Sequence, residues 1–113
     1  MRSLGEFEQL ILWSVLRLGD DAYGVPIGRE IEERTAKAVS PGALYTTLGR
    51  LEDRGLVTSR SEPGGASRSG RPRKYYRLSS EAAAELAASK ARITAMADGQ
   101  TEAIDKLMGN GAA

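Results

Sequence analysis

Apolar residues recur at helical spacing near the start of the chain. Residues 6–18 (EFEQLILWSVLRL) predict a helix that ends at Gly19, because glycine readily takes the left-handed conformation that follows a last helical turn. We expect one stripe of this helix to face the core of the domain: Phe7, Ile11, Val15 and Leu18.

The same helix also carries apolar side chains off that stripe, namely Leu12, Trp13 and Leu16. A helix that is apolar nearly all round is typical of a buried helix. In a chain of 113 residues a second element has to cover this other face, and we expect a partner subunit to do so.

A second helix is predicted from about Val25 to Ala36. Pro26 suits its first turn, where a missing N–H group costs nothing. Ile27 and Ile31 lie four residues apart, so we expect both to point inward.

Residues 41–54 carry the clearest helix signals. Ser40 is a favourable N-cap, Pro41 fits the first helical position, and Gly55 fits the left-handed position after the last turn. The residues expected to pack inward are Leu44, Leu48 and Leu51. The residues expected on the outer face are Gly42, Ala43, Thr46, Gly49 and Arg50, with Tyr45 and Thr47 on the flanks.

Two short strands follow, over 56–62 and 73–78, and the Gly-, Ser- and Pro-rich segment 63–72 predicts the turn between them. Three helices followed by a hairpin are the element order of a winged helix-turn-helix. The fold class is therefore mainly α with a small β-hairpin, and residues 1–79 form the predicted winged-helix domain.

Residues 80–108 are predicted to form a long C-terminal dimerisation helix capped by Ser79, followed by a disordered tail over 109–113. Gly99 is a weak point where this helix either continues, bends or ends early. The sparse apolar seam of the helix is Leu86, Ile93, Ile104 and Leu107.

Composition removes several classes of function. The chain has no cysteine and no histidine, which excludes disulfides, thiolate ligands and the commonest general base and metal ligand. We therefore expect no enzyme activity, no metal and no cofactor. No apolar run approaches the ~18 residues of a membrane span, and the first residues do not resemble a secretory leader, so we expect a cytoplasmic protein.

Positive charge is concentrated in one part of the chain, although the net charge is only +1. Residues 58–79 hold six Lys or Arg and one Asp or Glu, whereas residues 1–36 hold four and seven. Such asymmetry is typical of a surface that attracts nucleic acid. In a winged helix the third helix enters the major groove and the hairpin contacts the DNA backbone or the minor groove.

The outer face of the third helix suits base reading. Small residues let its backbone approach base edges, while Thr46 and Thr47 can bond to bases and contact thymine methyl groups. Cations that can meet phosphates or enter a narrow minor groove lie on or beside the hairpin tip: Arg68, Arg71, Arg73 and Lys74. Each feature alone also fits an ordinary solvated surface.

Two stretches, PGALYTTLGRLEDRGLV (41–57) and GRPRKYYRLS (70–79), closely resemble the signature stretches of the PadR-like transcriptional regulators, and AYGVPIGREIEE (22–33) fits more loosely. The resemblance covers about residues 4–80. It implies a winged-helix DNA-binding domain, a C-terminal helix that forms a homodimer, and action mostly as a repressor that a ligand releases.

Carried over by position, the resemblance implies a recognition helix over 41–54 and a wing over 62–74. It puts Tyr45, Thr46 and Arg50 near DNA, and Lys37 and Ser40 at backbone phosphates. Many members have Pro where this chain has Thr46, so base contacts there differ. The short C-terminal part resembles compact members with a single helix.

We predict an interface in which the first and last helices pack across a two-fold axis, which would set two recognition helices about 34 Å apart for a palindromic operator. Its predicted residues are Leu12, Trp13, Leu16, Leu86, Ile93, Ile104 and Leu107. Trp13 would suit a planar aromatic effector, although a single Trp in an apolar helix equally fits simple packing.

Three alternatives stay open at this stage. The winged helix can serve as a protein-interaction module whose basic hairpin grips an acidic partner. It can also belong to an activator, or to an architectural protein that binds DNA without sequence preference. Small outward residues on the third helix favour base reading over backbone contact alone.

Overall fold

The computed structural model describes residues 3–63 and 72–109 of the chain. This part is mainly α-helical with one antiparallel hairpin, which confirms the expected fold class. The elements are α1 Glu6–Leu18, the short 3-10 helix η1 Gly19–Asp21, α2 Gly24–Thr35, α3 Pro41–Asp53, β1 Val57–Glu62, β2 Arg73–Leu78, α4 Ser80–Ala97 and α5 Thr101–Leu107.

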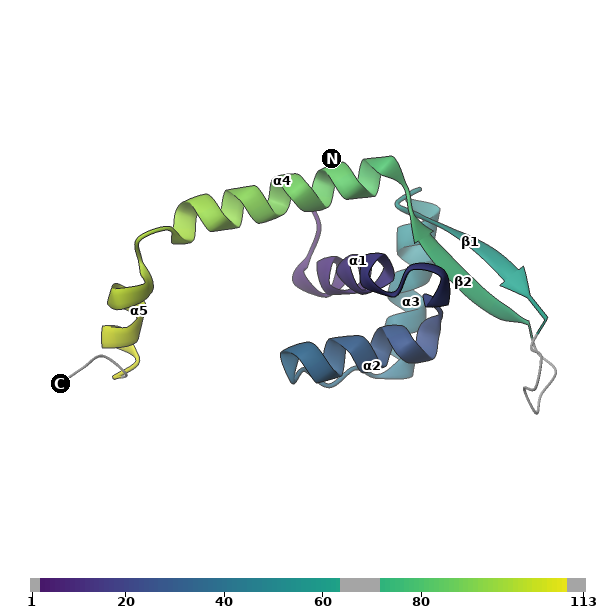
Figure 1. Cartoon of the computed structure of the whole chain (residues 1–113), viewed down its shortest axis with the longest axis horizontal. Coiled ribbons are helices and arrows are strands. Elements are labelled where there is room, and N and C mark those ends of the chain that lie inside the picture. The colour runs from purple at the N-terminus through teal and green to yellow at the C-terminus, as the bar shows by residue number, and fades with distance from the viewer. Residues whose placement is uncertain (1–2, 64–71, 110–113) are drawn as a thin grey trace.

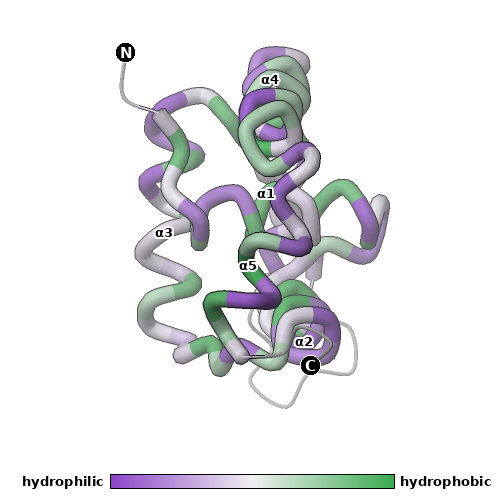
Figure 2. Tube along the Cα trace, turned by 90° about the vertical axis from the view of Figure 1, so that its left-hand side faces the viewer, coloured by the Kyte–Doolittle hydropathy of each residue, from purple (hydrophilic) through white to green (hydrophobic). Residues whose placement is uncertain are grey.

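Helix α1 lies at the centre of the fold. Helix α2 runs below it, α3 behind it and α4 above it, while the hairpin projects to one side and α5 lies at the opposite end (Figure 1). Figure 2 shows the same layers from the side, with α3 to the left of α1. Because α1 has neighbours on several sides, an apolar surface nearly all round it is what this position requires.

Within a single chain, α4 covers the second face of α1. Leu12 is fully buried, as is Leu86 of α4 at 1% exposure, and both belong to one core with Ile11 and Val15. The prediction that Leu12 and Leu86 lie at an interface with a partner is therefore wrong. Sequence periodicity cannot show that α4 folds back over α1, because that contact joins distant parts of the chain.

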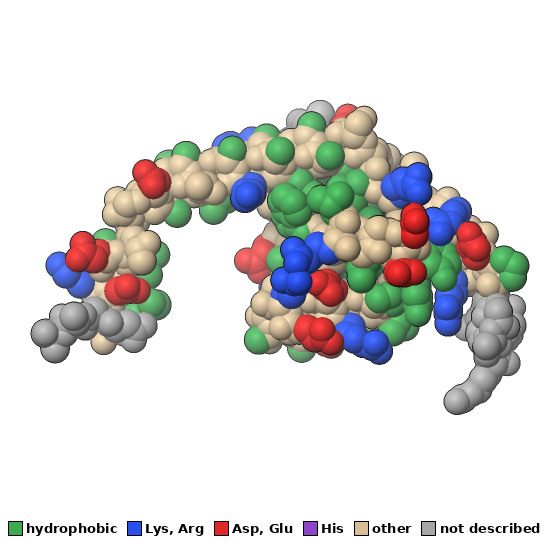
Figure 3. Space-filling view, viewed as in Figure 1, with side chains coloured by type: hydrophobic (Ala, Val, Ile, Leu, Met, Phe, Trp, Pro, Cys, Tyr) green, Lys and Arg blue, Asp and Glu red, His purple; other side chains and the backbone are tan. Residues whose placement is uncertain are grey.

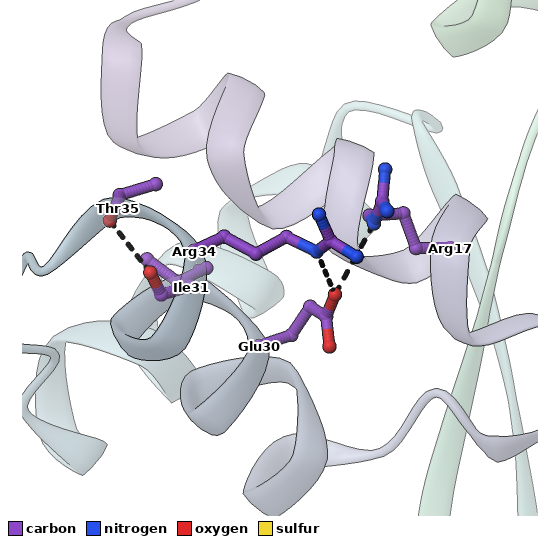
Figure 4. Close-up of polar contacts among 5 residues, drawn as sticks. All are labelled: Arg17, Glu30, Ile31, Arg34 and Thr35. Carbon is purple, nitrogen blue, oxygen red and sulfur yellow. Dashed lines mark hydrogen bonds and ion pairs between the residues drawn. The ribbon is translucent and has the colours of Figure 1, made fainter.

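An ion-pair network fixes α2 against the end of α1. The carboxylate of Glu30 in α2 accepts a hydrogen bond from Arg17 Nε of α1 at 3.2 Å and a second from Arg34 Nε one turn further along α2 (Figure 4). These two guanidinium groups hold the pKa of Glu30 below its usual value, the bond from Arg34 being the largest cause. Thr35 closes α2 by donating to the carbonyl of Ile31 at 2.6 Å.

Helix α3 begins and ends as predicted. The side chain of Ser40 accepts a hydrogen bond from Ala43 N at 3.2 Å, Pro41 is the first helical residue, and Gly55 has a φ of +74°. These local signals place the helix within one residue of its predicted bounds. Ile27 and Ile31 of α2 face it from the core, as expected.

The hairpin pairs Val57 with Leu78 and ends at the pair Glu62–Arg73. The backbone of Tyr23, just before α2, forms an additional bridge to Tyr75, and Tyr76 N donates to Ala22 O at 2.8 Å. The segment before α2 is therefore joined to β2 by a single bridge, next to the two-stranded sheet.

The C-terminal part is two helices and not the single helix expected over 80–108. Helix α4 ends at Ala97, Gly99 has a φ of +76°, and α5 begins at Thr101. The left-handed conformation at Gly99 lets the chain turn sharply there, as Figure 1 shows. Of the predicted tail, residues 110–113 lie outside the described part of the chain.

Candidate nucleic-acid interface

The outer face of α3 is exposed and almost free of charge over its first two turns. Gly42, Ala43 and Thr46 are exposed, and Arg50 follows one turn after Thr46. Among the described residues, Arg50 has no ion pair. Its side chain is exposed in the last turn of α3, beyond a surface of small side chains that a groove edge can approach closely.

Thr47 does not belong to this face. Its side chain is 9% exposed and lies in the inward stripe with Leu44, Leu48 and Leu51. Positions i, i+3, i+4 and i+7 share one helix face, so Thr47 lies on the same side as the leucines. The prediction that Thr47 contacts DNA is corrected accordingly, whereas Thr46 points outward.

Tyr45 is half exposed at 51% and leans against the start of α2. A β-carbon placed on Gly24 would lie 2.1 Å from the Tyr45 hydroxyl, so the close approach requires glycine at this position. A groove between α2 and α3 lies beside this contact and is lined in part by Gly28, Arg29 and Pro41. Arg29 is an exposed cation near the start of α3 that sequence reasoning missed, because nothing local shows that α2 presents it there.

The hairpin face toward α3 is held by Glu52 in the last turn of that helix. Ser59 donates to one carboxylate oxygen of Glu52 at 2.6 Å, and Lys74 Nζ lies 3.0 Å from the other. These partners, Ser59 first, lower the pKa of Glu52, and the bond to Glu52 raises the pKa of Lys74. Burial raises the pKa of the neighbouring Tyr76. The predicted phosphate contact Lys74 is thus exposed but internally paired.

Lys37, the predicted phosphate contact before α3, is also paired. Its Nζ lies 2.9 Å from a carboxylate oxygen of Glu6 at the start of α1, and half of its side chain is exposed. Ser40 contributes its hydroxyl to the α3 cap, so this oxygen already has a backbone partner. Ser40 is the N-cap of α3, and Lys37 precedes it by three residues in the chain.

The opposite face of the hairpin carries alternating cations and tyrosines. The guanidinium of Arg60 lies 4.8 Å from the centre of the Tyr75 ring, and that of Arg73 lies 4.6 Å from the centre of the Tyr23 ring. A hydrogen bond to Tyr75, followed by the charge interaction with Tyr23, raises the pKa of Arg73. Figure 3 shows Lys and Arg side chains along the hairpin side of the molecule with carboxylates among them.

Of the predicted hairpin-tip cations, Arg68 and Arg71 lie outside the described residues. Arg73 and Lys74 are described and exposed, but they point to different faces of the hairpin because strand side chains alternate. The alternation of Arg73, Tyr75 and Arg77 at every second position could have predicted that these side chains share the outer face of the hairpin. The sequence could not show that Tyr23 joins them, because its bridge to Tyr75 is a long-range contact.

A family model of transcriptional regulators matches most of the domain, over residues 12–88. The chain belongs to the transcriptional regulator PadR-like family. The protein is thus a DNA-binding transcriptional regulator. Members of this family are transcription factors and not enzymes.

Solved PadR structures agree with the fold of this PadR-like protein. A PadR family transcription regulator from Clostridium difficile R20291 is 26% identical, with a TM-score of 0.69 over 87% of this chain and 98% of the other. A PadR family transcriptional regulator from Eggerthella lenta DSM 2243 is 27% identical, with a TM-score of 0.65 over 91% and 86%. A PadR-like transcription factor described as from "bacteroid fragilis" is 28% identical, with a TM-score of 0.64 over 80% and 82%. No curated protein matches this chain significantly.

The remaining predicted interface residues of this PadR-like protein differ in how much surface they offer. Leu16 is 56% exposed, while Trp13 is partly buried and packs against the core of its own chain. The exposed apolar side chains of the two C-terminal helices are Ile93, Met96, Ile104, Leu107 and Met108. In the described residues, no helix is long and apolar enough to cross a membrane.

Proposed function

We propose that this PadR-like protein is a sequence-specific transcriptional repressor that binds a palindromic duplex operator as a homodimer. The observation that carries the proposal is the exposed, nearly uncharged outer face of α3, where Arg50 has no ion pair to any described residue, with a cationic hairpin beside it. Repression itself is supported by the resemblance to PadR-like regulators, which act mostly in that way.

Base reading is assigned to α3. The small side chains of Gly42 and Ala43 allow close approach to a groove floor, and Thr46 and Arg50 lie one turn apart on the same exposed face. Arginine commonly reads guanine through two hydrogen bonds, and threonine contacts thymine methyl groups. Tyr45, at the edge of this face, is placed to contact the sugar–phosphate backbone.

Backbone contact is assigned to Lys37, Lys74, Arg73 and Arg29. In the free chain Lys37 and Lys74 each lie on a carboxylate, and exposed ion pairs of this kind contribute only about 0–1 kcal/mol. Replacement of the carboxylate by a phosphate therefore costs little. The carboxylates also keep the lysine side chains ordered near the places where phosphates would arrive.

The dimer is supported by a helical stripe on α4. Ala82, Leu86, Ser89, Ile93 and Met96 follow a spacing of three and four residues, and the first two are buried on α1. Ser89 donates to Gln9 near the start of α1 at 3.1 Å, so the stripe beyond it passes the end of α1. Ile93 and Met96 are consequently 68% and 82% exposed.

We assign the cover of this surface to a second copy of the chain. Helix α5 adds Ile104 and Leu107, and Met108 follows as the C-cap of that helix; each is more than half exposed. Large contiguous apolar surfaces are rare on monomers, and a two-fold pairing would bury both copies of the stripe at once. A planar aromatic effector at Trp13 is a further part of the proposal, supported by the sequence; the Trp13 side chain is partly buried against the core, and Leu16, three residues further along α1, is 56% exposed.

Selection of bound duplexes from a random pool tests the function directly. We expect an enriched inverted repeat whose half-sites are about one helical turn apart, which reports sequence preference and dimeric binding together. Enrichment of no sequence, or of a single half-site, contradicts the sequence-specific dimer.

The salt dependence of binding separates DNA binding from capture of an acidic protein. If about three cations per subunit meet phosphate, the dimer is expected to show a log–log slope near −5 on duplex DNA. Lys106→Ala serves as a matched control, because α5 lies at the far end of the molecule from the hairpin (Figure 1). A slope near zero for the unaltered protein would be incompatible with the proposed interface.

A further inference from the structure

Four side chains from three segments form a continuous stack on the outer face of the hairpin. Arg60 of β1 lies on Tyr75 of β2, the Tyr75 and Tyr23 ring centres are 5.3 Å apart with an angle of 58° between the rings, and Arg73 lies on Tyr23. We call this set (Arg60, Tyr75, Tyr23 and Arg73) the arginine–tyrosine stack. Its ends are cations and its middle is aromatic.

The backbone explains why these side chains meet. Arg60 and Tyr75 are directly paired in the hairpin, and Tyr23 is joined to Tyr75 by the isolated bridge. Paired residues on one face of a sheet bring their side chains within about 5 Å of each other. The stack is therefore a row across three strand-like segments, extended by Arg73, which precedes Tyr75 by two residues on the same face of β2.

Stacking on a ring face orders a guanidinium without using its N–H donors, because the positive group lies over the electron-rich face of the ring and the N–H groups lie in the guanidinium plane. Arg73 bonds to Tyr75 as well, and stacking on Tyr23 takes none of its remaining donors. Arg73 is exposed and stands at the first position of β2, next to the predicted DNA-contacting tip. An arginine held in this way loses less side-chain freedom when it meets a phosphate.

We infer that Tyr23 is a positioning residue for Arg73, holding the guanidinium of Arg73 ready for a DNA phosphate beside the hairpin. This inference rests on the proposed DNA-binding function and adds a residue outside α3 and the hairpin to it. The backbone of Tyr23 also joins the start of α2 to β2. The residue that contacts the Arg73 guanidinium is therefore attached to the first residues of α2.

A thermodynamic cycle with DNA binding as readout tests the inference. The four proteins are the unaltered chain, Tyr23→Leu, Arg73→Ala and the double variant, each measured on one selected duplex. We expect Tyr23→Leu to weaken binding about two- to fivefold per subunit, as for an exposed cation–π contact. In the Arg73→Ala background the same change is expected to have no further effect.

Tyr23→Phe is the matched control, since it keeps the ring face and removes only the hydroxyl. We expect it to bind DNA as the unaltered chain does. Equal losses for Tyr23→Leu in both backgrounds indicate a merely structural role or a direct DNA contact by Tyr23, and either result overturns the inference.

A second readout needs no DNA. Ring currents from Tyr23 should move the side-chain Hδ resonances of Arg73 upfield in the unaltered chain and in Tyr23→Phe, but not in Tyr23→Leu. Unshifted Arg73 resonances in the unaltered chain overturn the inference. A folded protein that binds no duplex overturns the proposed function and this inference together, whereas additive losses in a DNA-binding protein overturn this inference alone.

Discussion

The hydroxyl of Tyr45 occupies the space that a β-carbon on Gly24 would need, 2.1 Å from its ideal position. This contact joins the first residue of α2 to the exposed face of α3 and fixes how the ring of Tyr45 lies. Gly28 lies one turn after Gly24 on α2, so a substitution at Gly28 is a control for the same substitution at Gly24.

Gly24→Ala is expected to displace the Tyr45 ring from its contact with residue 24. Because the ring is half exposed it can move, so we expect a loss of about 1 kcal/mol in the free energy of unfolding, at the low end for an overpacked site. Chemical denaturation measures the loss, which should vanish in a Tyr45→Ala background. At Gly28 an added β-carbon would meet its nearest neighbour at 3.5 Å, so Gly28→Ala is expected to be neutral or stabilising. Equal costs at the two positions would contradict this account.

Thr46 and Thr47 are expected to respond oppositely to truncation. Thr46→Ala should leave the free energy of unfolding within about 0.5 kcal/mol and alter the preferred base at one position of the selected site. Thr47→Ala should lower the free energy of unfolding by about 1 kcal/mol and leave the base preference unchanged, because its side chain is buried. Repeating the duplex selection with both variants checks the assignment, and a changed preference in Thr47→Ala would refute it.

Arg50→Ala is expected to weaken binding to the selected duplex by about 1–3 kcal/mol while nonspecific binding changes less. The reason is that the Arg50 guanidinium, which has no ion pair among the described residues and is exposed in the last turn of α3, can read a base edge. Titration of the selected and a scrambled duplex measures the two affinities, with Lys106→Ala as the control for loss of one charge. A parallel fall in both affinities would show that Arg50 meets only phosphate.

Acid is expected to destabilise the fold through Glu30 and Glu52. Their pKa values are lowered in the folded chain, by bonds from Arg34 and Arg17 to Glu30 and from Ser59 and Lys74 to Glu52. The stabilisation is therefore present above the ordinary carboxyl value of about 4.5 and is lost as the pH falls through the lowered values. Glu30→Gln should be less stable at pH ~7 and show a flatter decline below pH ~4.5. Glu102→Gln, on α5, is the control for loss of an exposed carboxylate. A Glu30→Gln protein whose stability declines with acid as steeply as that of the unaltered chain would rule out this origin.

Ile93→Glu is expected to separate the proposed dimer. A charge in the middle of the uncovered α4 stripe would be buried without a partner in the pair, which should raise the dissociation constant at least ~10-fold. Sedimentation velocity at several concentrations measures this. Ala84→Glu, exposed on the opposite side of α4, should leave the association unchanged. A chain that sediments as a monomer before any substitution would disprove the dimer.

Local signals in the sequence predicted helix ends well. Gly19, Ser40 and Gly55 act through conformations and hydrogen bonds within a few residues, so their effects are readable from neighbouring positions. The outer face of α3 followed from the spacing of its leucines, apart from Thr47. Thr47 is buried together with the leucines, so the buried face of α3 is wider than the spacing of the leucines alone indicates.

Long-range contacts account for most of what the sequence could not show. The cover of Leu12 by α4 and the bridge between Tyr23 and Tyr75 both join segments that are remote along the chain. Pairing of Lys37 with Glu6 and of Lys74 with Glu52 depends in the same way on the folded arrangement. Gly99 was readable as a weak point, but the end of α4 at Ala97 and the positive φ of Gly99 are properties of the three-dimensional structure.

Ser79 joins α4 to the segment that follows α3. Its hydroxyl donates to the carbonyl of Leu56 at 3.2 Å and accepts from Ala82 N at 3.1 Å, and its own N–H donates to the same Leu56 carbonyl at 3.0 Å. Leu56 itself is bonded back to Leu51 in α3. The end of α3 and the beginning of α4 are therefore linked through hydrogen bonds that meet at Leu56 and Ser79. We expect a change in the direction of α4 to be transmitted through these bonds to the end of α3.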